Sequence, residues 1–193
     1  MEQAICKRCG AQILQATADK TGGVCMPCKT GTRESIEASK LYYQRERELD
    51  KTDPFRKLWR ELVHRVCNTD LGYARLSHAE KKYFAVGMLE GEVYNGGFDQ
   101  YFFNSSSSYY SDAEAGLEEM GAMQALSLLR RAKQIAFGVA PVPEDTGRRR
   151  EILLQTDFES RAIQLDKLDD LFWEDPDGLS ERAESFARKH GLV

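Results

Sequence analysis

Four of the five cysteines fall within the first 28 residues, in two C-x-x-C pairs: Cys6 with Cys9, and Cys25 with Cys28. Each C-x-x-C turn brings two sulfurs to one side of a metal ion, and the intervening segment folds back to deliver the second pair. Because zinc prefers four tetrahedral thiolates, the spacing predicts a zinc site. Sulfur would fill all four positions and leave none for water or substrate, so we expect Zn²⁺ to be structural rather than catalytic.

Residues 1–30 are too few to bury a stable apolar core, and metal binding can supply the missing stability. Ile13 and Leu14 before a Thr-Gly-Gly turn, with Val24 after it, predict a short hairpin between the cysteine pairs, which gives a zinc ribbon. Two disulfides would need an oxidising compartment, and a C-x-x-C redox pair needs a larger βαβ context. Lysines and arginines alternate with acids here, so direct nucleic-acid binding has little support.

Length and composition favour one moderate domain beside the ribbon. The chain has 193 residues, 41% of them hydrophobic, and a net charge of −4. Its apolar runs are too short for a membrane span, and its first twenty residues lack the pattern of a signal peptide. We therefore expect a cytoplasmic protein without membrane contact. Cys67, the fifth cysteine, is interpreted as a small buried hydrophobic residue.

Helical patterns follow the ribbon to the end of the chain. Residues 31–52 are charged and helix-forming, which predicts a helical connector, and 53–193 show only helical periodicity. The fold class is therefore mainly α, a small four-cysteine zinc ribbon followed by an all-α domain of about seven or eight helices. The expected helices begin at Pro54, after the Ser77 capping box, and near 112, 122, 146, 158 and 179.

A dense motif runs through the middle of the chain. Its special residues are Glu90, Glu92, Asn95, Gly96, Gly97, Phe98, Gln100, Tyr101 and Asn104. Gly96 and Gly97 permit a tight reversal that ends the preceding helix. Two interpretations stay open: the polar side chains satisfy backbone groups at that reversal, or they line a recognition or catalytic pocket. No catalytic residue is assigned, because the three histidines are isolated and Glu90 and Glu92 point to different helix faces.

The same motif, written E-x-x-N-G-G-F-x-Q-Y-F-x-N, resembles the bacterial DNA-mimic protein family. The resemblance extends loosely from Asp53 to the C-terminus. It implies an all-helical, dimeric protein that presents DNA-like negative charge to a helix-turn-helix transcription factor. Other members of that family carry an N-terminal ribbon.

The distribution of charge bears on that implication. Residues 151–181 contain ten acids against Arg161 and Lys167, a local net charge of −8. In the helix after Phe158, apolar residues are expected to face inward and to leave Glu159, Asp166 and Asp170 along one outer stripe. We assign the acidic surface to Glu159, Asp166, Asp169 and Asp170. The alternative is that these acids are ordinary solvated faces.

The leading hypothesis is a non-enzymatic binding protein whose acidic helices engage a DNA-binding transcription factor. An immunity protein that neutralises a nuclease toxin would use a similar surface. A small-ligand or enzymatic site at the central motif, and a ribbon that binds nucleic acid, are the hypotheses from other classes.

Overall fold

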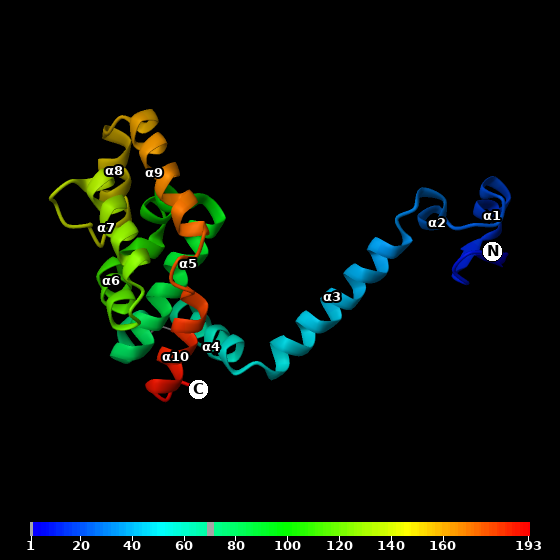
Figure 1. Ribbon diagram of the computed structural model, residues 1–193, viewed down its shortest axis with the longest axis horizontal. Coiled ribbons are helices and arrows are strands. Elements are labelled where there is room, and N and C mark those ends of the chain that lie inside the picture. Colours follow the sequence, from blue (N-terminus) through cyan, green and yellow to red (C-terminus); the bar gives the residue numbers. More distant parts are fainter. Residues whose placement is uncertain (1, 69–71) are drawn as a thin grey trace. The chain divides into compact units, whose positions relative to one another are not determined.

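The computed structural model describes residues 2–68 and 72–193 (Figure 1). It divides into two compact units, Met1–Asp53 and Pro54–Val193. The first unit consists of β1 (Gln3–Ile5), β2 (Gln12–Leu14), α1 (Gln15–Thr21), α2 (Met26–Thr30) and α3 (Arg33–Thr52).

The hairpin of the first unit lies elsewhere than the sequence predicted. β1 pairs antiparallel with β2, with Ala4 opposite Ile13, so the hairpin encloses the first cysteine pair. The residues after β2 form the helix α1, which ends where Gly22 adopts a left-handed conformation at φ 71°. The prediction that Val24 would pair with Ile13 and Leu14 was therefore wrong. The turn at Gly22 was located correctly, but it ends a helix rather than connecting two strands.

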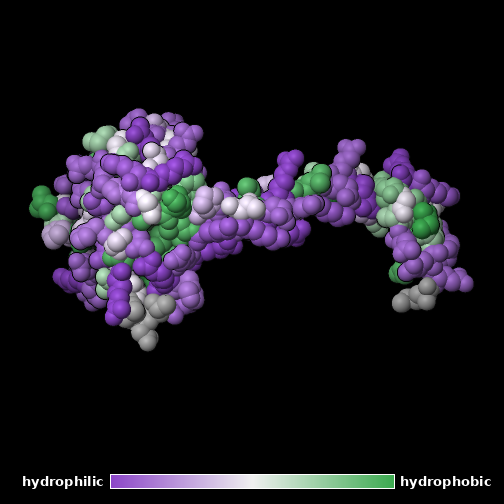
Figure 2. All heavy atoms as spheres, turned by 90° about the horizontal axis from the view of Figure 1, so that it is seen from below, coloured by the Kyte–Doolittle hydropathy of each residue, from purple (hydrophilic) through white to green (hydrophobic). Residues whose placement is uncertain are grey.

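None of residues 33–52, which form α3, is buried. Its surface in Figure 2 is mostly hydrophilic with a few apolar residues between. Leu41 and Leu49 are exposed apolar residues of this helix. Ion pairs at helical spacing support it: Glu37 contacts both Arg33 and Lys40, at 3.1 and 3.0 Å. Most helical stability in proteins comes from tertiary packing, so such pairs and an anchored end matter more here than in a packed helix.

The second unit is all-helical, which confirms the predicted fold class. Its elements are α4 (Pro54–Asn68), η1 (Tyr73–Arg75), α5 (His78–Phe103), η2 (Ser105–Tyr109), α6 (Tyr110–Glu119), α7 (Met123–Phe137), α8 (Thr146–Gln155), α9 (Phe158–Trp173) and α10 (Leu179–Lys189). Helices α8 and α9 begin at residues 146 and 158, where the sequence predicted them. The serine-rich stretch after the central motif forms the 3-10 helix η2.

Helix α5 is the central element and packs against α4 and α6 to α10 (Figure 1). It begins with the capping box predicted at Ser77 and Glu80. Most of its apolar side chains are completely buried, including Leu89, Val93 and Phe98. Cys67, in contrast, is exposed at the end of α4, so its interpretation as a buried residue was wrong.

Helix α5 is broken rather than ended by its glycine pair. Gly96 is at φ −166°, ψ 23° and Gly97 at φ 79°, ψ 179°, and helical geometry resumes at Phe98. A conformation such as that of Gly97 is accessible almost only to glycine. The sequence thus located the break correctly, but the chain continues into a second helical segment instead of a loop.

Candidate functional site

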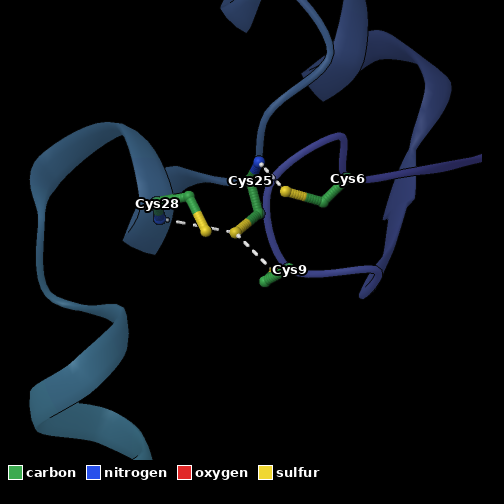
Figure 3. A group of neighbouring side chains, drawn as sticks. All are labelled: Cys6, Cys9, Cys25 and Cys28. Atoms are coloured by element: carbon green, nitrogen blue, oxygen red, sulfur yellow. Dashed lines mark hydrogen bonds between the residues drawn. The ribbon is translucent and has the colours of Figure 1, made fainter.

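The four N-terminal cysteines converge on one point from the hairpin turn and from α2 (Figure 3). Their sulfur atoms all lie within 4.8 Å of one another. The Sγ atoms of Cys9 and Cys25 are 3.7 Å apart. Sulfurs bound tetrahedrally to zinc, at about 2.3 Å each, are separated by about 3.8 Å. The four thiols therefore have the number and spacing that a tetrahedral metal ion needs.

Hydrogen bonds from nitrogen donors favour the thiolate form of Cys6 and Cys25. The Cys25 backbone N–H donates to the Cys6 Sγ at 3.2 Å, and the Arg33 Nη2 donates to the Cys25 Sγ at 3.1 Å. The bond from Cys25 lowers the pKa of Cys6 to about 6, and the bond from Arg33 lowers the pKa of Cys25. Burial raises the pKa of Cys28 to about 12. Metal binding would have to displace the Cys28 proton, since metals bind the thiolate form.

Local structure holds the cysteine pairs in place. Cys25 is the N-cap of α2, and its sulfur accepts the Cys28 backbone N–H at 3.4 Å. Pro27 lies in the first turn of α2, where its missing N–H costs nothing. In the other pair, Gly10 closes the turn at φ 71° and donates its N–H to the Cys6 carbonyl at 3.0 Å.

The polar residues of the central motif interact mainly with one another. The Glu92 carboxylate accepts from Gln100 Nε2 at 2.8 Å and from Asn104 Nδ2 at 2.9 Å. Ser106, outside the motif, donates its hydroxyl to the same carboxylate at 2.5 Å. This cluster ties the two segments of α5 to η2 across the break. Asn95 is exposed and does not join it.

The break in α5 also receives a side chain from α9. The Phe98 N–H donates to the Asp169 Oδ1 at 2.8 Å, and a Cβ added at Gly97 would collide with the same carboxylate. Asp169 is only 5% exposed, and this burial raises its pKa to about 6. Its assignment to the acidic surface was therefore wrong: it was counted as an outward-facing acid, but it caps the free N–H at the helix break.

The other three predicted acids, Glu159, Asp166 and Asp170, are exposed along α9. Within Phe158–Trp173 the basic residues are Arg161 and Lys167, and Arg161 is buried, with its Nε 2.8 Å from the Asp99 Oδ1. The outer face of α9 therefore keeps three carboxylates and one lysine. We call Glu159, Asp166 and Asp170 the acidic stripe.

A model of the family described as DMP19-like protein matches residues 74–190. The chain belongs to the DMP19-like family. Comparison with curated proteins and with solved structures gave no match. The matched region contains the central motif and the acidic stripe, while the four-cysteine cluster lies outside it. The DNA-mimic resemblance inferred from the motif is thus confirmed for most of the all-α unit.

Two surface hollows of about 330 and 430 Å³ lie along α7 of the DMP19-like region. Both are lined by Arg130 and Gln134, and neither includes a residue of the central motif or of α9. None of the helices in the described residues is both long and apolar enough to cross a membrane.

Sequence reasoning missed the arginines of the DMP19-like region that point inward. Arg149 is completely buried, although Arg148 to Arg150 look like a surface run. A signal was present, because Arg149 lies one helical turn before the buried Leu153 and shares its face of α8. Phe158 is the opposite case: it is an apolar residue, at the start of α9, and yet it is 61% exposed.

Proposed function

We propose that this protein is a non-enzymatic binding protein whose acidic stripe engages the basic, DNA-contacting surface of a protein partner. The stripe supplies the observation that carries the proposal: three carboxylates exposed on one helix face, with the neighbouring Arg161 withdrawn into the interior. Family membership supports the same role, since DMP19-like proteins are the DNA-mimic family.

Helix geometry sets the spacing of the stripe. Glu159 and Asp166 are separated by about 10 Å along the axis, and Asp166 and Asp170 by about 6 Å, at 1.5 Å per residue. Duplex DNA carries one charge per about 1.7 Å, so three carboxylates present a sparser charge than DNA does. Neighbouring helices or a second subunit would have to add carboxylates, which fits the dimer implied by the family resemblance.

We propose Zn²⁺ as the ion of the four-cysteine cluster, with a structural role. Four thiolates are the donor set that zinc prefers, and they leave no open position for a reaction. A cytoplasmic location fits four cysteines kept as free thiols. Zinc would hold the hairpin to α2 and supply stability that so small a unit cannot obtain from its core.

The small-ligand alternative loses support, because Glu92 spends its hydrogen bonds on Gln100, Asn104 and Ser106. The immunity-protein alternative would use the same stripe against a nuclease. Competition with DNA does not distinguish the DNA-mimic hypothesis from the immunity-protein hypothesis, but the activity of the captured protein does. A transcription factor binds its operator without cutting it, while a nuclease cuts DNA and would be inhibited when this protein binds it.

The test is capture from the native host with the full chain. The stripe variant carries Glu159→Gln, Asp166→Asn and Asp170→Asn. The matched control removes the same charge at exposed acids outside α9, Glu118→Gln, Glu144→Gln and Glu181→Gln. We expect a partner that the control retains, the stripe variant loses, and duplex DNA displaces. A partner held equally by both variants and indifferent to DNA would refute the proposal.

A further inference from the structure

Arg33 links the four-cysteine cluster to the long helix that follows it. Its Nη2 lies 3.1 Å from the Cys25 Sγ, and its Nη1 lies 3.1 Å from the Glu37 Oε1 on the next turn of α3. The side chain is three-quarters buried, at 24% exposure. One guanidinium thus connects a predicted metal ligand to the second turn of a helix in which no residue is fully buried.

The path of the chain makes this contact short and direct. Cys25 caps α2, Cys28 lies within it, and Gly31 ends it in a left-handed conformation at φ 77°. Helix α3 begins two residues later, at Arg33. Arg33, the first residue of α3, therefore contacts the sulfur of Cys25, the N-cap of α2, across that short helix.

The contact between Arg33 and Cys25 is also favoured by charge. Four thiolates around a divalent ion carry a net charge of −2, which a nearby cation stabilises. The guanidinium is always charged, and its planar fork can donate to a sulfur and a carboxylate at once. Donors placed just outside the ligands of a metal orient those ligands and tune the affinity of the site.

Helix α3 needs such an anchor. Its N-cap, Thr32, makes no side-chain capping bond, and none of residues 33–52 is buried. The first turn is the costly step in forming a helix, and a helix without tertiary packing frays from its ends. A guanidinium fixed between Cys25 and Glu37 holds that first turn in place.

We propose that Arg33 couples metal binding at the four-cysteine cluster to helical order in the first half of α3. This coupling rests on the proposed metal site and assigns to that site control over the order of α3. Coupling of this kind is reciprocal: if the bound metal stabilises α3 through Arg33, then an ordered α3 raises metal affinity by the same factor.

The test compares Arg33→Gln with Arg45→Gln, which makes the same chemical change at an exposed position of the same helix. Cobalt(II) titration of the full chain first establishes four-thiolate binding from its absorption spectrum, and competition with a chelator then gives zinc affinity. Hydrogen exchange is followed over residues 33–44 with and without zinc. For Arg33→Gln we expect zinc affinity to fall about tenfold and zinc-dependent protection of that segment to be lost. Arg45→Gln should behave as the wild type does.

The outcomes separate the two proposals. A wild-type chain without a cobalt–thiolate spectrum would overturn the metal site and this inference with it. Normal cobalt binding, with Arg33→Gln matching wild type in both zinc affinity and exchange, would overturn the coupling alone. Arg33→Lys keeps the charge but lacks the fork, so partial recovery of affinity without recovery of protection would support the geometry described.

Discussion

Replacing Arg149 by methionine should destabilise the all-α unit by about 3 kcal/mol, because this buried guanidinium is the donor for carbonyl and hydroxyl oxygens of three segments. Arg149 is 0% exposed and pairs with no carboxylate among the described residues. Its acceptors are the carbonyl oxygens of Phe102, Asn104, Pro143 and Glu144 and the hydroxyls of Ser108 and Thr146, at 2.7 to 3.2 Å. The side chain thereby fastens the end of α5 to η2 and to the loop before α8.

The magnitude follows from what methionine would leave behind. Four carbonyl oxygens would lose a charged donor, although those of Phe102, Asn104 and Glu144 keep a serine hydroxyl donor. A hydrogen bond to a charged group contributes about 1.5 to 3 kcal/mol. Removing the guanidinium also recovers the free energy spent on burying its charge, which offsets part of that loss. The net change of about 3 kcal/mol corresponds to a fall in melting temperature of about 10 °C for a unit of this size.

Denaturation followed by tryptophan fluorescence measures this change cleanly, because Trp59 and Trp173 both lie in the all-α unit. The matched control is Arg148→Met, one residue earlier, where the side chain is 61% exposed and pairs with Glu151. An exposed pair contributes about 0.5 kcal/mol or less. If Arg149→Met and Arg148→Met differ by less than about 1 kcal/mol, the guanidinium does not hold these segments together and the reasoning fails.

Three further predictions use the same fluorescence assay. Gly97→Ala should lower the free energy of unfolding by about 2 kcal/mol or more, because alanine is strained at φ 79° and its Cβ would collide with Asp169. Gly91→Ala, which has open space around it, should be neutral or stabilising. Equal effects of the two substitutions would contradict the proposed strain. The pKa of Asp169 is raised from 3.8 to about 6 by burial, so its contribution to stability is complete below pH 4 and is lost as the pH rises through 6. Unfolding free energies of wild type and Asp169→Asn should therefore diverge over that window, and parallel curves would count against it. Tyr101→Phe should leave stability unchanged or raise it by about 1 kcal/mol, since the Tyr101 hydroxyl is buried without a partner in the described part of the chain; a clear loss would reveal a partner for that hydroxyl.

Local rules predicted much of this fold. Pro54 in a first turn and the Ser77 capping box are recognisable from a few adjacent residues, and both helices begin there. The hairpin was misplaced because strand pairing depends on distant partners, and nothing local to Ile13 reveals that it pairs with Ala4 rather than with Val24.

The site residues also divide into those that local spacing reveals and those that depend on distant contacts. The four cysteines were found because metal geometry fixes their spacing, which is visible in the sequence. Asp169 was misassigned because its neighbours Asp166 and Asp170 are exposed, and only contact with a helix break 71 residues away distinguishes it. Arg33 was missed because a donor outside the ligands carries no spacing signature, although it touches a cysteine eight residues earlier.

The bond between Asp169 and the Phe98 N–H has a consequence for the opposite side of α9. An apolar helix can rotate or slide against its neighbour at little cost, but a buried carboxylate with a single matching donor permits only one azimuth. Turning α9 by one residue one way would place Leu168 against that donor and leave the N–H without an acceptor; turning it the other way would bury Asp170, an acid of the acidic stripe. The inward-facing Asp169 thus fixes the rotation of α9 about its axis and determines which of its carboxylates face solvent.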